Sequence, residues 1–544
     1  MSTLEEVLRL RKAEGILQAP TGDTNVNEEV TSATNPTLQI SLQNNTNSSN
    51  VWAYITGLDI NKGNAVFVLR SDGVAPYYPD SPAKTLTPLA ADCHIRLGSP
   101  GSTRVVTIPQ LAGGRIWFCV DGQLTFLVNP GPALVEPSVM NPSDPNYNLL
   151  WSFAEFTYNT FQLFANITYV DFVSIPISLA LTSTNPATPS QRVLGIPPSG
   201  LTTIASALLA QHARDSADWD KLIIVSPSTS LPLRALSPNS AIKLFSSSGT
   251  PLFKNYYAPY VSAVWSKYRT TPLTLNTQSQ WGTLNGAVSP STNRLTFPGV
   301  GSFAPPETED IFSCSTGPFA PQAGPNGEAM GNISARLAAA LNRSTLLRNS
   351  VQPDGERVSD YYRDGVTNHY ARVVHEASVD GRGYAFPYDD VNPSGGDTAG
   401  GDAAGTVSDG SPGVFVVSVG GPAVLVGGKE MGEGGGSDIE KGGRDLITPY
   451  FERRPEMLVP AATAGAARRR IAEWAERAAD LGGPVVERGV RPVVWLVFWL
   501  GGFMALSTRL LTSRVVSVVL LLLASGYLAA FGLAGEGGHI ADPS

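Results

Sequence analysis

The first part of the chain is a series of short apolar runs separated by turn-forming residues. Between about residues 38 and 139, runs rich in Val, Ile, Phe and Trp alternate with Gly, Pro, Asn and Asp; examples are VWAYITGLD, AVFVLR, RVVTIP and GRIWFCV. This pattern is typical of strands joined by turns. Residues 147–182 continue it with YNLLWSFAEFTYN and FANITYVDFVSIPISLAL, which predict two strands with a short connection. We therefore expect a β-sandwich or barrel.

The pattern changes after Gly195. The run LTTIASALLAQHARDSADWDKLIIVSP predicts a helix that leads into a strand, and ISARLAAALNRSTLL, at about residues 333–347, predicts a second helix. Strand and turn patterns return with HYARVVHEAS, GYAFPYDDV and GVFVVSV. We therefore expect a mixed α/β insertion, at about residues 196–367, within a β domain that comprises about residues 35–195 and 368–420.

The two ends of the chain differ from this central part. Residues 1–34 are polar and predict a flexible lead-in, without an apolar run of signal-peptide length. Residues 421–490 predict a Gly-rich linker and a charged helix. Two apolar runs follow within residues 491–536, and they predict one or two membrane-spanning helices because the second is long enough to cross a bilayer. The alternative is that residues 421–544 are foreign to the catalytic unit.

Composition and charge narrow the classes of function. The chain has 544 residues, of which 42% are hydrophobic and 15% charged, so a folded core is expected. A formal net charge of -8 leaves no basic field for a phosphate backbone, which argues against nucleic-acid binding. Three cysteines and five scattered histidines show no metal-ligand spacing. We expect neither a metal site nor a cofactor.

One segment combines carboxylates with aromatic residues. In a strand with period two, Glu155, Thr157 and Asn159 share a face. On the following strand Tyr169 shares a face with Asp171, and a hairpin could bring Asp171 near Glu155 across the sheet. Cleavage of a glycosidic bond needs such a pair of carboxylic groups. The alternative is that the two acidic residues bind Lys or Arg or cap a turn.

These residues also carry a resemblance to a known family. WSFAEFTYN, LFANITYVDFVSIPISL, GRIWFCVDGQLTFLVNPGPALVEPSV and NHYARVVHEASVDGRGYAFPYDDV together resemble glycoside hydrolase family 64, over about residues 35–420. That family comprises endo-β-1,3-glucanases of the laminaripentaose-producing type with a thaumatin-like core. The resemblance implies inversion at the anomeric carbon, with Glu155 as general acid and Asp171 as general base.

The resemblance also implies residues that bind the sugar chain. Thr157 and Asn159 match positions that line the groove, and Phe164 is a candidate apolar platform for a sugar ring. Thr168 matches a groove position too, although simple alternation places it opposite Asp171, so that a bulge or bend would be needed. For the YAFPYDD segment, with Tyr384, Phe386, Asp389 and Asp390, a structural turn packed into the core is the alternative to ligand contact.

Together these observations predict a mainly β protein: a thaumatin-like β-sandwich or barrel domain, a mixed α/β domain that forms a wide groove with it, and a C-terminal helical membrane-type tail. We expect endo-hydrolysis of β-1,3-glucan by a monomer without a cofactor. The alternative is a non-catalytic glucan-binding wall protein of thaumatin-like type. From the resemblance we expect an extracellular or cell-wall location and a fungal source. The N-terminal residues do not predict a signal peptide, however, and the C-terminal tail predicts attachment to a membrane.

Overall fold

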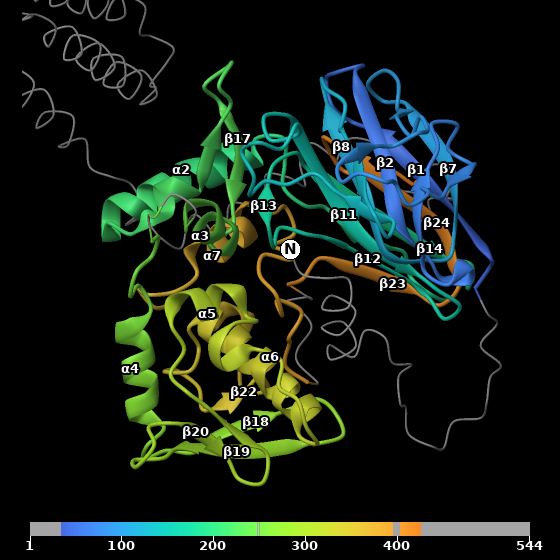
Figure 1. Ribbon diagram of the computed structural model, residues 1–544. Coiled ribbons are helices and arrows are strands. Elements are labelled where there is room, and N and C mark those ends of the chain that lie inside the picture. Colours follow the sequence, from blue (N-terminus) through green and yellow to red (C-terminus); the bar gives the residue numbers. More distant parts are fainter. Residues whose placement is uncertain (1–33, 247–248, 250, 395–402, 426–544) are drawn as a thin grey trace, which may run out of the picture. The chain divides into compact units, whose positions relative to one another are not determined.

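The computed structural model describes residues 34–246, 249, 251–394 and 403–425 (Figure 1). The chain divides into two compact units, Met1–Gly428 and Lys429–Ser544, and the second lies outside the described residues. Within the described ranges, no helix has both the length and the apolar character needed to cross a bilayer. The membrane-spanning helices predicted within residues 491–536 lie outside these ranges.

The largest sheet of the described residues carries the candidate site. Its strands run in the order β23-β12-β11-β8-β2-β3-β4, with β6 also paired to β2. Their bounds are Thr406–Asp409 (β23), Leu163–Ile167 (β12), Leu150–Tyr158 (β11), Leu111–Val120 (β8), Val51–Asp59 (β2), Ala65–Leu69 (β3), Pro76–Tyr77 (β4) and Ile95–Arg96 (β6). The antiparallel hairpin of β11 and β12 confirms the two strands expected around residues 151–172.

A second sheet packs against one face of the large sheet (Figure 1). Its order is β15-β14-β24-β1-β7, with the bounds Gln191–Val193 (β15), Ile177–Ser183 (β14), Pro412–Val419 (β24), Thr37–Asn44 (β1) and Thr103–Pro109 (β7). A Cβ atom added to Gly195 would meet both the Ile177 carbonyl of the second sheet and the Ile167 side chain of the large one. Ile167 pairs with Ala154, so these two residues face the sandwich core and Glu155 faces away from it.

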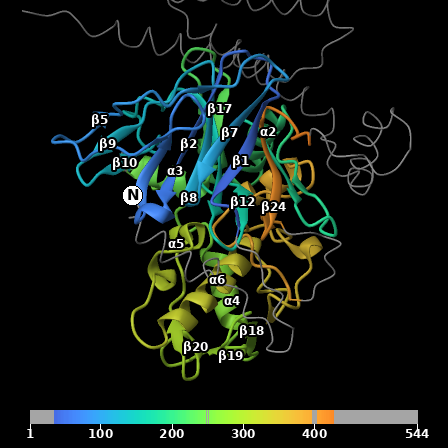
Figure 2. The same ribbon diagram turned by 90° about the vertical axis from the view of Figure 1, so that its right-hand side faces the viewer.

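Three smaller sheets complete the β structure of the described residues. One has the order β10-β9-β5, the next β13-β17-β16 and the last β21-β20-β19-β18-β22 (Figures 1 and 2). Their bounds are Ala133–Val135 (β10), Leu127–Asn129 (β9), Thr87–Pro88 (β5), Phe172–Val173 (β13), Pro232–Leu236 (β17), Ile223–Val225 (β16), Gly301–Phe303 (β21), Leu295–Phe297 (β20), Thr283–Val288 (β19), Leu273–Asn276 (β18) and Val351–Gln352 (β22). The fold is mainly β.

Helices are concentrated between residues 200 and 377 (Figure 1). The α-helices are Gly200–Asp215 (α2), Pro238–Ser246 (α3), Ala258–Lys267 (α4), Thr308–Ser313 (α5), Gly327–Arg343 (α6) and His369–Ala377 (α7). Short 3-10 helices span Ile60–Lys62, Asp218–Leu222, Gly317–Phe319 and Val358–Asp360. The helices predicted after Gly195 and around residues 333–347 are confirmed as α2 and α6.

The strand predicted for HYARVVHEAS is wrong, because this segment forms helix α7. Asn368 caps the helix, since its side chain accepts a hydrogen bond from the backbone N–H of Ala371. Tyr370, Val373 and Val374 are buried, and they are spaced three and four residues apart, as on one helix face. The cap and this spacing outweigh the strand preference of the two valines.

The YAFPYDD segment takes part in a buried ionic network. Asp389 is fully buried, 3.1 Å from Nη2 of Arg343 on α6 and 2.9 Å from Nε2 of His375 on α7. Burial favours the neutral carboxyl, but these two cations hold the pKa of Asp389 below its ordinary value. Phe386 is buried as well. Asp389 and Phe386 are therefore part of a structural turn packed into the core, which was the alternative to contact with a ligand.

Candidate active site

A row of polar residues crosses the large sheet on the face that points away from the sandwich core. Direct pairing aligns one residue from each of five adjacent strands: Thr56 (β2), Arg115 (β8), Glu155 (β11), Asn166 (β12) and Thr406 (β23). Residues paired in this way lie on the same face of a sheet, about 5 Å apart. We call these five residues the polar row. Two charged residues, Arg115 and Glu155, lie at its centre.

Arg115 is shared between two carboxylates. Its Nη1 donates to Oε2 of Glu136, and both its Nε and Nη2 lie 3.4 Å from Oε1 of Glu155. The side chains of Arg115, Glu136 and Glu155 are 30%, 27% and 17% exposed, so a substrate can reach them. Burial by itself lowers the pKa of Arg115, but Glu136, Glu155 and Asp171 outweigh it and raise that pKa. The guanidinium therefore remains charged.

Aromatic rings support Arg115 from the same face. Its guanidinium carbon lies 5.1 Å from the ring centre of Phe153 and 5.6 Å from that of Trp117. These two rings pack on each other with their centres 4.6 Å apart. Contacts of a cation with ring faces add to the attraction of the carboxylates. The aromatic residues thus fix the position of the charge at the middle of the sheet.

A hydrogen bond from Thr56 on β2 of the large sheet holds the Glu136 side chain in place. Glu136 directly follows β10, and its Oε1 accepts a hydrogen bond of 3.1 Å from the hydroxyl of Thr56. That hydroxyl in turn accepts a hydrogen bond of 3.0 Å from the indole N–H of Trp117. Because the hydroxyl oxygen takes up the indole hydrogen, its own hydrogen is directed at Glu136. The small sheet of β10 thereby contributes a carboxylate to the face of the large one.

Asp171 lies between β12 and β13, where the chain leaves the large sheet. Its backbone carbonyl accepts a hydrogen bond from the Ser237 N–H just before α3. Burial raises the pKa of Asp171; Arg115 and Lys243 of α3 oppose this shift and Glu155 adds to it. The charge of Asp171 in turn raises the pKa of Arg115, as that of Glu155 does.

The alternation predicted for Asp171 is not what brings it to Glu155. Glu155 pairs with Asn166, so Ile167 lies on the opposite face, and β12 ends at that residue. Asp171 reaches the site from the bend that follows, beyond the range in which alternation applies. Thr168 directly follows β12 and forms an isolated parallel bridge with Tyr384. The chain then bends at residues 170 and 171, which agrees with the bulge or bend that we expected between Thr168 and Asp171.

The other candidate groove residues lie along the β11–β12 hairpin. Thr157 pairs with Phe164, next to the pair of Glu155 and Asn166. Beside Thr157 the pairing of β11 with β8 shifts in register, because Phe156 and Tyr158 both find partners on β8 and Thr157 has none there. Asn159 stands at the turn, where its side-chain oxygen accepts hydrogen bonds from the N–H groups of Phe161 and Gln162.

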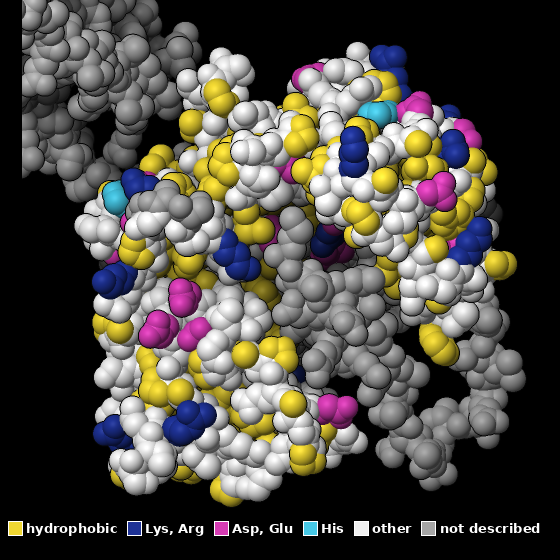
Figure 3. Space-filling model, in the orientation of Figure 1, with side chains coloured by type: hydrophobic (Ala, Val, Ile, Leu, Met, Phe, Trp, Pro, Cys, Tyr) yellow, Lys and Arg dark blue, Asp and Glu magenta, His cyan; other side chains and the backbone are white. Residues whose placement is uncertain are grey.

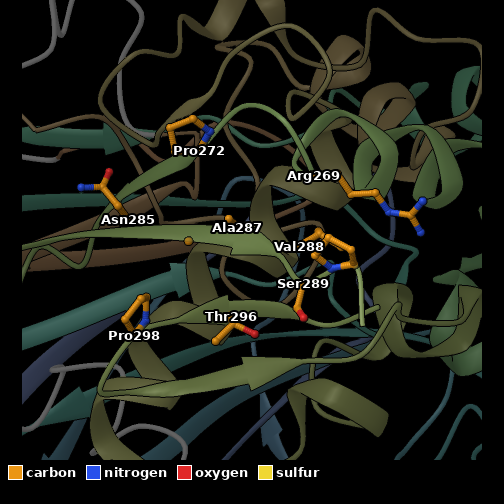
Figure 4. Close-up of a pocket in the computed structure, with 10 residues that line it drawn as sticks. Arg269, Pro272, Asn285, Ala287, Val288, Ser289, Thr296 and Pro298 are labelled. Atoms are coloured by element: carbon orange, nitrogen blue, oxygen red, sulfur yellow. The ribbon is translucent and has the colours of Figure 1, made fainter. Parts of the chain in front are cut away.

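The space-filling view shows where charges gather on this side of the molecule. In Figure 3, acidic and basic side chains lie next to each other at the bottom of a hollow. A separate pocket of about 400 Å³ is lined by Arg269, Pro272, Asn285, Gly286, Ala287, Val288, Ser289, Pro290, Thr296 and Pro298 (Figure 4). Its lining includes no carboxylate, so it does not offer acid or base groups. Within the described ranges, no cluster of three His, Cys, Asp or Glu side chains could hold a metal ion.

Arg115 and Glu136 were missed by reasoning from the sequence. A charged residue inside the apolar strand run GRIWFCV was a signal, because a buried charge needs a partner. The sequence did not show which partner, since Glu136 reaches Arg115 from a different sheet. Glu155 and Asp171, by contrast, were singled out from the sequence. Glu155 forms an ion pair with Arg115, and the charge of Asp171 raises the pKa of Arg115.

Comparisons with known proteins place this chain in a family. A model described as "Beta-1,3-glucanase", glycoside hydrolase family 64, matches residues 36–419. A glucan endo-1,3-beta-glucosidase of Arthrobacter sp. (strain YCWD3) is 32% identical over 292 residues, which are 53% of this chain and 50% of the relative. One of Cellulosimicrobium cellulans is 32% identical over 291 residues, with the same shares. The chain thus spans about half the length of the curated relatives it matches.

Solved structures agree with this result. The fold is similar to that of a laminaripentaose-producing beta-1,3-glucanase in complex with laminaritetraose, with a TM-score of 0.60 and 28% identity over 71% of this chain and 99% of the other. A beta-1,3-glucanase domain from Clostridium beijerinckii has the same fold, with a TM-score of 0.52 and 21% identity over 71% of this chain and 98% of that one. The chain belongs to glycoside hydrolase family 64. The two curated relatives are bacterial and lend no support to a fungal source.

Proposed function

We propose that this protein is an endo-β-1,3-glucanase that inverts the configuration of the anomeric carbon. The observation that carries the proposal is the ion pair of Glu155 with Arg115 on an accessible sheet face, together with the charge of Asp171, which raises the pKa of the same guanidinium. Membership in the family and the glucanase names of the relatives support the same activity. The proposed substrate is the β-1,3-glucan polymer, bound by a monomer without a cofactor.

In the proposed reaction Glu155 acts as the general acid and Asp171 as the general base. Glu155 gives its proton to the glycosidic oxygen as the bond from that oxygen to the anomeric carbon breaks. Asp171 takes a proton from a water molecule, whose oxygen bonds to the anomeric carbon from the opposite face of the sugar. Such a water needs a separation of about 6.5–9.5 Å between the two carboxyl groups, and its attack gives an α-anomer.

The groove that binds the glucan is proposed to follow the β11–β12 hairpin. Phe164 offers an apolar platform, while Thr157, Thr168 and Asn159 offer hydrogen-bonding groups to sugar hydroxyls. The proposed catalytic unit spans residues 35–420, with a thaumatin-like β domain and an α/β part at about residues 196–367. In this proposal the two parts form a wide groove, and residues 421–490 and 491–536 form a linker with a charged helix and a membrane-type tail.

The test uses the full chain with laminarin. Reducing ends measure the rate, and NMR of fresh products identifies the anomer that is released first. We expect the α-anomer from the wild type, and a rate lowered by about 10²- to 10⁴-fold in Glu155→Gln and in Asp171→Asn, because each loses one partner of acid–base catalysis. First release of the β-anomer would contradict inversion. A folded wild type that binds laminarin without hydrolysing it would point to a glucan-binding protein.

A further inference from the structure

The two ion pairs of Arg115 are unequal. The contact of Nη1 with Glu136 is the closer one, whereas Nε and Nη2 both approach the same oxygen of Glu155 at 3.4 Å. A close bidentate pair would instead bring two nitrogens to about 2.7–2.9 Å from the two carboxylate oxygens. Arg115 is therefore drawn toward Glu136, and its pair with Glu155 is a loose one.

We propose that Glu136 is a positioning residue: by binding Arg115 it prevents a close ion pair between Arg115 and Glu155, so that Glu155 keeps the proton it must donate. This inference rests on the proposed function. Glu136 touches no reacting atom in this scheme and acts only through Arg115. It extends the acid–base pair to a third carboxylate that comes from a different sheet.

The hydrogen bond from Thr56 that holds Glu136 favours a positioning role for Glu136 over a chance contact with Arg115. Thr56 is 1% exposed, and its hydroxyl is directed at Glu136 by the indole of Trp117. A carboxylate that only neutralised a surface arginine would need no buried hydroxyl to hold its second oxygen. With that oxygen fixed, Oε2 of Glu136 faces Arg115, and the guanidinium is held on the side away from Glu155.

The charges around Glu155 agree with the proposal. The site places the carboxylates of Glu136 and Glu155 on the one guanidinium of Arg115, so that neither has this cation to itself. A close pair with Arg115 would instead stabilise the Glu155 carboxylate and promote loss of its proton. Among the described residues, the titratable and charged groups that act on this cluster include Arg115 (β8), Glu136 (after β10), Asp171 (before β13), Lys243 (α3) and Tyr370 (α7). The neighbours on β2, β12 and β23 are the neutral Thr56, Asn166 and Thr406, and Arg382 donates to the backbone carbonyl of Thr406 at 2.9 Å.

The test is the pH profile of kcat/KM for Glu136→Gln in the full chain with laminarin. Glutamine keeps an acceptor for Thr56 but loses the charge that attracts Arg115. We expect the alkaline limb, which reports the general acid, to move to lower pH by about one unit, so that the rate on that limb falls about tenfold. On the acidic side of the optimum the rate should stay within about threefold of the wild type.

Two further measurements separate positioning from a structural role. With a nitrophenyl laminarioligosaccharide, whose leaving group needs little help from a proton, Glu136→Gln should retain most of the wild-type rate. Thr56→Val, which removes the hydroxyl that holds Glu136, should shift the alkaline limb in the same direction by a smaller amount. This variant carries the test if Glu136→Gln does not fold.

A matched control is Asp360→Asn, which also removes a carboxylate bound to an arginine, Arg357, at 3.1 Å. Its pH profile should equal that of the wild type. An unshifted alkaline limb in Glu136→Gln, or a loss of rate that is uniform with pH, would overturn the inference while the wild type remains an active glucanase. A wild type that does not hydrolyse laminarin would refute the proposed function itself, and this inference with it.

Discussion

Among the single residues of the site, Asp171 has the least favourable surroundings for its proposed charge. Its raised pKa means that the folded protein holds the Asp171 proton more tightly than the unfolded chain does. The ionised form therefore costs stability at pH values above the raised pKa. This loss of folding stability begins as the pH rises past 3.8, the ordinary pKa of an aspartate, and it grows until the pH exceeds the raised pKa of Asp171 in the folded protein. Well below pH 3.8 the loss is absent, because Asp171 is protonated in both the folded and the unfolded state. The proposed base is thus active at the expense of stability.

Removal of this charge should stabilise the fold. We expect Asp171→Asn to raise the Tm at pH 7 by roughly 1–3 °C, even though the same change is expected to lower the rate of hydrolysis. The gain should shrink as the pH approaches 3.8, because Asp171 of the wild type then takes up a proton. Thermal unfolding followed by circular dichroism at a series of pH values measures the difference. A Tm of the variant below that of the wild type at pH 7 would contradict the argument.

The sequence identified some residues of the site and left others unseen. Glu155 could be found because a lone carboxylate alternates with aromatic residues in a strand. Asp171 was found through the resemblance to the family, whereas the alternation argument for it fails, since β12 ends before it. Arg115 and Glu136 escaped notice because their contact joins two sheets, and local periodicity carries no information about such pairs.

Among the elements, helix α7 shows how a short polar signal decides secondary structure. Asn368 accepts a hydrogen bond from the Ala371 N–H, and its amide donates to Oδ1 of Asn342 on α6 at 2.9 Å. Both asparagines are buried. The prediction of a strand relied on the two valines of HYARVVHEAS and did not take Asn368, the residue before this run, into account. Caps and buried polar partners therefore correct the assignment that β-branched residues suggest.

This cap gives a prediction for stability. Asn368→Ala should lower the free energy of unfolding by about 1–2 kcal/mol, because the variant loses the cap and leaves the amide partner on α6 unsatisfied. Asn368→Ser retains a side-chain oxygen for the cap and loses only the amide donor to Asn342, so its loss should be smaller. Urea unfolding at equilibrium measures both variants. Equal losses in the two would show that the cap contributes little.

In the unit as a whole, the first and last described strands lie side by side. β24 pairs in parallel with β1 and antiparallel with β14, so it is an interior strand of the second sheet. Its residues Val416, Val417 and Val419 are buried. The loss of an interior strand exposes both of its neighbours and part of the core. The unit thus depends on residues near its C-terminal end.

Two truncations test this dependence. A chain that ends at residue 425 keeps β24 and should hydrolyse laminarin at a rate within about twofold of the full chain. A chain that ends at residue 411 lacks β24 and should fail to unfold cooperatively in a thermal scan, because burial of three valines alone contributes several kcal/mol. Activity and circular dichroism are measured on both. A cooperative transition in the shorter chain would show that β24 is dispensable.

The pairing of Ile40 with Phe415 also bears on how the protein emerges from the ribosome. Translation proceeds at about 5–20 residues per second, so β24 is synthesised roughly 20 to 75 seconds after β1. Until then, the edge of β1 that pairs with β24 has no partner. During that time the nascent chain exposes an unpaired apolar strand, which is a known starting point for aggregation. The sandwich can close only near the end of translation of this unit, so production of the protein in a foreign host should benefit from slow synthesis or from chaperones that bind the nascent chain.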